Sequence, residues 1–324
     1  MKKLLFCLLA TFVTACSGGG HFQFLDEPVD GPISPSVGTT PSVNQELAAK
    51  AGLERIVFRI GPVDLPAGTR VDAMLDRPLV MRFHLSAPAW IVGFEPRVID
   101  VQGARLPGDL LHEALLINAH DEDPLCGAGS SGNPIAAATS LLTDIHFPDG
   151  YGYPILPTDP LEARVVLKNQ TDKSYPDVSF EIALLTKPMN ELMDFKEIVP
   201  VLLEFDPCDH EPIDIPPGEF KPRTQTFTMA RGGNIVLANG LAGDFAATIS
   251  LAKDQDAAPF WQAAARLDED HRLLGLDPNP FEDPAGVSIA AGGNLLLSLT
   301  YDNTSTDWLA GAPAGAMVYL AEEE

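Results

Sequence analysis

Short β-prone runs separated by Pro, Gly and Asp dominate the chain from Leu53 onward, and they constrain the fold more than any other feature. A first series of runs and a second series follow one another along the chain. Such evenly spaced short strands, with turn residues between them, predict an antiparallel β-sandwich architecture. The expected strands are residues 56–60, 79–85, 90–94, 115–117, 163–168, 178–185, 201–205, 224–229, 234–238, 246–251, 287–289, 295–301 and 317–320. We also expect helices at 189–197 and 259–266.

The first residues have the pattern of an export signal. Lys2 and Lys3 precede an apolar run, residues 4–13, which is too short to span a bilayer as a helix. Val-Thr-Ala then leads to Cys16, and this sequence resembles a lipoprotein processing site. The alternative is an ordinary secretory signal with an incidental cysteine. The glycine-rich stretch that follows is typical of a tether, so we expect a lipid on Cys16. By resemblance to the sorting rules of Gram-negative lipoproteins, serine at position 17 favours the outer membrane.

Composition divides the remainder of the chain. Residues 17–50 are rich in Gly, Pro, Ser and Thr, which is typical of a stalk. We expect a signal peptide (1–15), a lipidated stalk (16–52), an N-terminal sandwich (53–195) and a C-terminal sandwich (196–324). The chain has 324 residues, 45% hydrophobic content and a formal charge of -24. An acidic surface of this kind repels nucleic-acid phosphates, so we expect no nucleic-acid partner.

Two of the four cysteines remain after the signal and the lipid site are set aside. Cys126 and Cys208 are expected to form a structural disulfide, because an exported protein meets an oxidising compartment. A thiolate metal site is the alternative. The absence of Cys-x-x-Cys spacing favours the disulfide.

Several segments, in order, resemble the type II copper, ascorbate-dependent monooxygenases, whose members include peptidylglycine α-hydroxylating monooxygenase. The resemblance lies in residues 110–118 (Leu-Leu-His-Glu-Ala-Leu-Leu-Ile-Asn), 147–154, 165–169, 292–303 and 314–318. Plant stress-induced nodule proteins and bacterial relatives share the pattern. The resemblance implies two tandem jelly-roll-like β-sandwich domains, in agreement with the strand pattern.

The resemblance also implies two copper sites, and the sequence departs from both. At the first site the three histidine positions correspond to His112, Glu113 and Asn169. At the second, the paired histidine positions correspond to Ala238 and Gly240, and the methionine position to an alanine. A copper centre needs about three imidazole or soft ligands. We therefore expect a degenerate, non-catalytic member of the fold, with copper expected only if the site has been altered rather than lost.

Two acidic clusters are weaker metal candidates. His120 and Asp121 follow the His112 segment, and His210 lies in a second cluster near Cys208. His and carboxylate ligands suit zinc and other divalent ions, whereas the simpler reading is a solvated acidic loop. The three tryptophans (Trp90, Trp261 and Trp308) are expected in cores, with a sugar-binding platform as the alternative.

The sequence therefore predicts a non-enzymatic cell-envelope lipoprotein, anchored in the outer membrane, that acts as a binding or structural surface module. Its expected partners are the membrane, through the lipid, and an envelope or surface protein. The alternative is a copper-dependent monooxygenase with an altered metal site. A non-enzymatic lipoprotein is expected to bind no cofactor, whereas the monooxygenase alternative implies copper.

Overall fold

The chain is all-β in the computed structural model, which describes residues 52–71, 75, 77–127, 130–189, 194–205, 208, 213–254 and 258–322. Twenty strands and one short 3₁₀ helix, η1 (Gly108–Leu110), make up the described elements. The expected lipid site at Cys16, the stalk and His210 lie outside the described residues. Among the described residues, no helix is long and apolar enough to cross a membrane.

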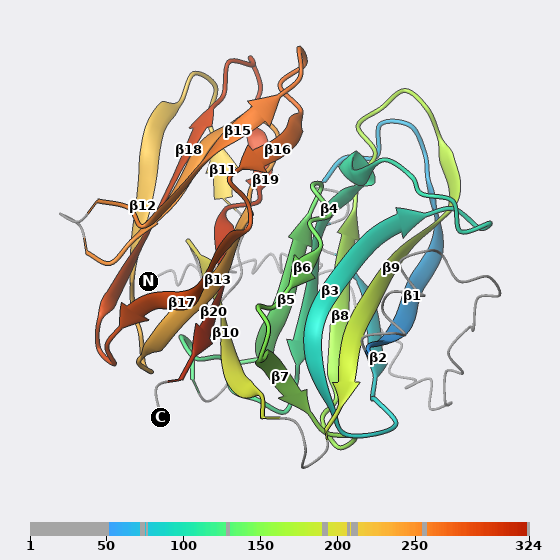
Figure 1. The fold of residues 1–324 in the computed structure, drawn as a ribbon. Helices are drawn as coiled ribbons and strands as arrows, with labels where there is room; N and C mark the ends of the chain where they lie inside the picture. Colours follow the sequence, from blue (N-terminus) through green and yellow to red (C-terminus); the bar gives the residue numbers. More distant parts are fainter. Residues whose placement is uncertain are drawn as a thin grey trace, which may run out of the picture. The chain divides into compact units, whose positions relative to one another are not determined.

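The first half of the body is a sandwich of two sheets (Figure 1). One sheet has the order β2-β8-β4-β5. Its strands are β2 (Leu79–Phe83), β8 (Leu161–Leu167), β4 (Leu111–Asn118) and β5 (Asn133–Thr139). The facing strands are β1 (Glu54–Leu65), β9 (Tyr175–Pro188), β3 (Ala89–Ile99), β6 (Ile145–His146) and β7 (Tyr151–Ile155). These pairs are antiparallel, and apolar residues from both sheets form a common core.

The second half contains a five-stranded sheet of order β12-β18-β14-β15-β16. Its strands are β12 (Phe220–Thr228), β18 (Asn294–Asp302), β14 (Ala246–Ala252), β15 (Trp261–Leu267) and β16 (Leu273–Asp277). Opposite it lie β10 (Lys196–Glu204), β20 (Gly315–Ala321), β13 (Gly233–Leu241) and β17 (Phe281–Ile289). A short pair, β11 (Ile213–Ile215) and β19 (Leu309–Ala312), completes this half.

One sheet runs through both halves. A short parallel pairing joins β7 to β10, so that strands of the first sandwich and strands of the second form a single nine-stranded sheet. Strands β10, β13 and β20 are buried on both faces: Leu202 and Tyr319 pack into the first core, whereas Leu203 and Leu320 pack into the second. Continuous apolar runs in these strands follow from burial on both faces.

The two halves share a corner motif that the strand pattern alone does not reveal. Residues 64–69 (Asp-Leu-Pro-Ala-Gly-Thr) and 214–219 (Asp-Ile-Pro-Pro-Gly-Glu) form the same turn, with a positive φ at each glycine. In both halves a buried asparagine after the second strand of a sheet closes the turn, Asn169 after β8 and Asn303 after β18. The halves therefore repeat one structural plan.

The asparagine makes equivalent contacts in each corner. Asn169 Nδ2 donates to the carbonyl of Leu65 at 3.0 Å, and Asn303 Nδ2 donates to that of Ile215 at 3.1 Å. Each Oδ1 accepts the backbone N–H and the hydroxyl of the residue two positions later, Thr171 or Ser305. Buried backbone carbonyls need such partners, because an unpaired one costs about 1–3 kcal/mol.

Neither expected helix is observed among the described residues. Residues 259–266 were expected to form a helix, but Trp261–Leu267 is strand β15, with burial that alternates along the first four residues. Trp261, Ala263 and Leu267 lie an even number of residues apart and therefore face the same side of the strand. This two-residue period is typical of a strand, whereas a helix would repeat every three to four residues. In the segment 189–197, residues 190–193 lie outside the described part, and Lys196 and Glu197 belong to β10 rather than to a helix.

Candidate functional site

His112 lies at a β-bulge where the register of β4 against β8 shifts. Its side chain is buried, and its Nδ1 has no hydrogen-bond partner. The neighbouring cation is Lys168, a buried side chain whose Nζ lies 3.4 Å from Asp244 Oδ2. Burial, and then the positive charge of Lys168, lower the pKa of His112 from 6.5 to about 4. The imidazole is therefore neutral at neutral pH.

The other two positions of the resembled first copper site differ from His112 in what they do. Glu113 is the next residue of β4, and Asn169 is the corner asparagine. The Asn169 amide donates to three backbone carbonyls, those of Leu65, Pro66 and Lys173. Its oxygen accepts two hydrogen bonds from one threonine. Both lone pairs of that oxygen are thus in use, and the side chain serves the backbone.

The resembled second copper site falls within β13. Ala238 is fully buried in the second core, and Gly240 has no side chain to ligate. A Cβ at Gly240 would lie 2.9 Å from Leu276 Cδ1 and 3.0 Å from Trp261 Cη2. Any larger side chain there must displace this packing. Together with the single imidazole at His112 and the adjacent lysine, these residues do not fit a copper centre.

The His120 cluster lies at the opposite end of β4 from His112. Eight residues of strand separate them, which corresponds to about 26 Å at ~3.3 Å per residue, so the two histidines cannot share a ligand. His120 Nδ1 lies 2.9 Å from Asp159 Oδ1. The hydrogen bond to Asp159 raises the pKa of His120. Asp121 Oδ2 accepts hydrogen bonds from Tyr153 and Asn118.

These contacts order an acidic loop against the sandwich. Tyr153 donates to Asp121 at 2.5 Å, and burial, followed by this hydrogen bond, raises the pKa of the tyrosine. Within the described residues, no three His, Cys, Asp or Glu side chains lie close enough together to hold a metal ion.

The expected disulfide is confirmed. Cys126 lies in the loop between β4 and β5, Cys208 follows β10, and the two are bonded with a Cα–Cα distance of 5.4 Å. The bond closes a loop of 82 residues and ties the first half of the body to the second.

The tryptophans do not share one environment. Trp261 is buried in the second core and donates its Nε1–H to the carbonyl of Pro278 at 2.9 Å. Trp90 is half-buried and stacks on Phe195. Trp308 is 61% exposed and lies next to β19. The core expectation is therefore confirmed for Trp261 and wrong for Trp308.

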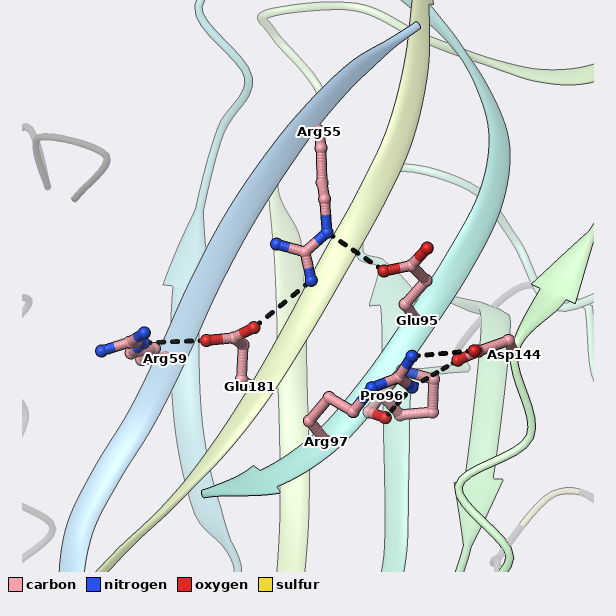
Figure 2. A network of polar contacts seen from close by, with 7 residues as sticks. All are labelled: Arg55, Arg59, Glu95, Pro96, Arg97, Asp144 and Glu181. Carbon is pink, nitrogen blue, oxygen red and sulfur yellow. Dashed lines mark hydrogen bonds and ion pairs between the residues drawn. The ribbon is translucent and has the colours of Figure 1, made fainter. Parts of the chain in front are cut away.

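A charged network on the outer face of the first sandwich escaped the sequence reasoning. Arg55 on β1 bridges Glu95 on β3 and Glu181 on β9, and Arg59 also pairs with Glu181 (Figure 2). Arg97 on β3 pairs through both Nη atoms with Asp144. Arginines four residues apart on β1 point to the same face of a strand, so the signal was present. Their partners depend on strand order, which the sequence does not show.

No protein-family model matches this chain, and no curated protein matches it. Among solved structures it is similar to a chain of Sulfolobus turreted icosahedral virus, with a TM-score of 0.34, 9% identity and coverage of 83% of this chain and 90% of that chain. It is also similar to a chain of the naturally empty cowpea mosaic virus top component, with a TM-score of 0.33, 8% identity and coverage of 82% and 88%. The chain is also similar to the major capsid protein of mavirus, with a TM-score of 0.23, 10% identity and coverage of 98% of this chain and 93% of that chain. Similarity at this level carries no conclusion about function.

Proposed function

We propose that this chain is a cell-envelope lipoprotein, held in the outer membrane by a lipid on Cys16, whose all-β body is a non-catalytic binding or structural module. The observation that carries the proposal is the role of Asn169. At the position that resembles a copper ligand, this side chain instead closes a corner, as Asn303 does in the other half. A position used in this way in both halves is explained by folding and needs no catalytic role.

The links between the two halves support a rigid structural or binding body. The β7–β10 pairing, the Cys126–Cys208 disulfide and a shared apolar core join them. Buried Lys168 in the first half also meets Asp244 in the second. A partner protein of the envelope or the cell surface would meet a preformed surface, which lowers the entropic cost of binding.

One observation favours the alternative, a copper-dependent monooxygenase with an altered site. The Nδ1 atom of His112 is buried without a partner, and an orphaned imidazole nitrogen is a metal-ligand type. Two observations disfavour this alternative. The positive charge of Lys168 acts on the His112 ring, and the Asn169 amide already donates hydrogen bonds to backbone carbonyls. A cationic neighbour disfavours a bound cation, so we derive no reaction step through copper.

Lipid attachment is tested by feeding cells an alkyne fatty acid and detecting the label on the full chain. We expect label on the wild-type chain and its loss in Cys16→Ser, together with release of the protein from the membrane fraction. Cys7→Ser is the matched control, because Cys7 lies inside the expected signal, and it should keep the label. Unlabelled wild-type protein in the soluble fraction would contradict the anchor.

A further inference from the structure

A pocket of about 270 Å³ opens beside the charged network of the first sandwich. Its walls come from the end of β3, from the connection between β3 and η1, and from the loop between β5 and β6. The apolar part of the wall consists of Val98, Leu106, Leu141 and Leu142. Three charged residues complete the wall: Arg97, Arg105 and Asp144. A concave surface that combines apolar side chains with a few convergent polar groups is a usual form of a small-molecule site.

The backbone on both sides of Arg105 is held by hydrogen bonds. Asp100 Oδ1 accepts the backbone N–H groups of Gln102 and Ala104 at 2.9 and 2.8 Å. The N–H of Leu106 donates to the carbonyl of Val98 at 2.8 Å. Arg105 lies between these anchors, so its position at the pocket is set before any ligand arrives, which lowers the cost of binding.

The opposite wall contains a strained residue. Leu142 has a φ of 49°, in the left-handed region that leucine rarely adopts, and its N–H donates to the carbonyl of Thr139 at 2.9 Å. Such a conformation costs of the order of 1–3 kcal/mol and persists only where the surroundings impose it. It turns this loop so that Leu141, Leu142 and Asp144 all line the pocket.

Of the two arginines that line the pocket, Arg97 is paired with a carboxylate and Arg105 is not. Arg97 is 11% exposed and is paired with Asp144 through both Nη atoms, as Figure 2 shows, and it also donates to the carbonyl of Pro96. Arg105 is exposed and makes no ion pair within the part of the chain that the structure describes. The two arginines and one aspartate that line the pocket therefore sum to a charge of +1, in a chain whose formal charge is -24.

We propose that this pocket binds a small organic monocarboxylate, with the carboxylate on Arg105 and the apolar part against the leucines. The guanidinium fork matches a carboxylate in a bidentate arrangement. A single negative charge fits better than two, because Asp144 lies in the same pocket and repels a dianion. The pocket volume of about 270 Å³ suits a small acid with a short chain or one ring.

This inference deepens the binding role in the proposed function by naming a ligand class, and it rests on that role alone. It requires neither the lipid nor a metal. Its failure is distinguishable from that of the proposed function, because ligand binding is measured on protein in solution and anchoring is measured by labelling in cells.

The test is calorimetric titration of benzoate into the full mature chain in detergent micelles, with empty micelles as the blank. We expect saturable 1:1 binding, weakened at least tenfold by Arg105→Gln and abolished by Arg105→Glu. Arg272→Gln is the control, since Arg272 is also an exposed arginine but lies outside the pocket lining, and it should leave binding unchanged. Because Arg105 is exposed, its replacement leaves the core intact.

Benzyl alcohol, which keeps the ring and lacks the charge, separates carboxylate recognition from apolar partition. We expect it to bind at least tenfold more weakly than benzoate. No saturable benzoate binding above the micelle blank would overturn the proposal. Equal affinity for Arg105→Gln and wild type, or for benzyl alcohol and benzoate, would overturn it as well.

Discussion

The corner at Asn169 in the first sandwich and the corner at Asn303 in the second have the same contacts but different surroundings. Both turns have Asp, Pro and Gly at the same positions, and a bulge in the neighbouring strand accompanies each. His112 occupies the bulge in the first half, and Ala247 is its counterpart in the second. The residues that build the corner are thus repeated, whereas the residue at the bulge is not.

This difference separates what holds the fold from what is particular to one half. Lys168, before Asn169, is buried and meets Asp244, whereas its counterpart Asp302 is half-buried. The buried histidine and lysine both belong to the first half, at its contact with the second. The corner asparagines therefore hold the same turn in both halves, whereas Lys168 contacts Asp244 and contributes to the contact between the halves.

Among the changes that test how the two halves differ, removal of the disulfide should lower the free energy of unfolding most, because this bond joins the two halves. Cys126→Ala with Cys208→Ala removes a cross-link that closes 82 residues, and we expect a loss of about 4 kcal/mol in the free energy of unfolding. Urea denaturation followed by circular dichroism measures it. If the halves are otherwise independent, the single transition should split in two. An unchanged midpoint would contradict a structural role for the bond.

The two corner asparagines should have similar effects. Asn169 Nδ2 donates to the carbonyl of Leu65, and Asn303 Nδ2 donates to that of Ile215. The other carbonyls that these amides meet also accept hydroxyl donors, from Thr69, Thr171 and Ser305. Because an unpaired buried carbonyl costs about 1–3 kcal/mol, we expect Asn169→Ala and Asn303→Ala each to lower the free energy of unfolding by about 3 kcal/mol. The same denaturation experiment measures both losses. A loss in only one of the two variants would contradict the equivalence of the corners.

The buried histidine predicts a pH dependence of stability that Ala247, its counterpart in the second half, cannot contribute. Because its pKa falls from 6.5 unfolded to about 4 folded, the native state favours the neutral ring. This stabilisation is full above pH 6.5 and is lost as the pH falls through 4, by about 3 kcal/mol. Denaturation midpoints from pH 7 to pH 4 measure it.

The matched comparison for this pH dependence uses two variants. His112→Asn should flatten the part of the pH dependence that His112 contributes, whereas His146→Asn, at an exposed histidine, should retain it. Equal slopes in wild type and His112→Asn would show that the ring is not held neutral by its surroundings.

The smallest effect should come from the hydroxyl partners of the two asparagines. Thr171→Val and Ser305→Ala each remove a hydroxyl that donates to an asparagine oxygen and also contacts the backbone of Lys173 or Asp307. We expect losses of about 1 kcal/mol in each half, because water can replace the exposed backbone contacts and the remaining hydrogen bond contributes about 0.5–1.5 kcal/mol net. Thermal unfolding resolves a difference of this size. A loss in one half alone would mean that the two corners are not built alike.

Most of the strands could be predicted from the sequence, because alternation and turn residues mark them directly. Strand β5 was missed: Asn133–Thr139 is a short run with one proline and three alanines, which carries little β signal. The sequence of β15 favours a helix, because Gln262 to Arg266 is rich in alanine, a strong helix former. Tertiary packing against β14 and β16 decides it.

The corner motif and the pocket show two reasons why the rest was out of reach. The repeat of Asp, Pro and Gly is visible in the sequence, but its two copies are 150 residues apart and short. The Arg97–Asp144 pair and the position of Arg105 depend on how β3 lies beside the loop after β5, which no local pattern encodes. The lipid on Cys16 and the resemblance to the copper enzymes stay predictions.

The most direct test of the non-catalytic reading is metal content. The full mature chain is loaded with copper, dialysed, and measured for bound metal per chain, beside His112→Ala. The account predicts negligible copper in both, because among the described residues no second imidazole joins His112 and the positive charge of Lys168 acts on its ring. Near-stoichiometric copper that is lost on His112→Ala would contradict the account and favour the monooxygenase.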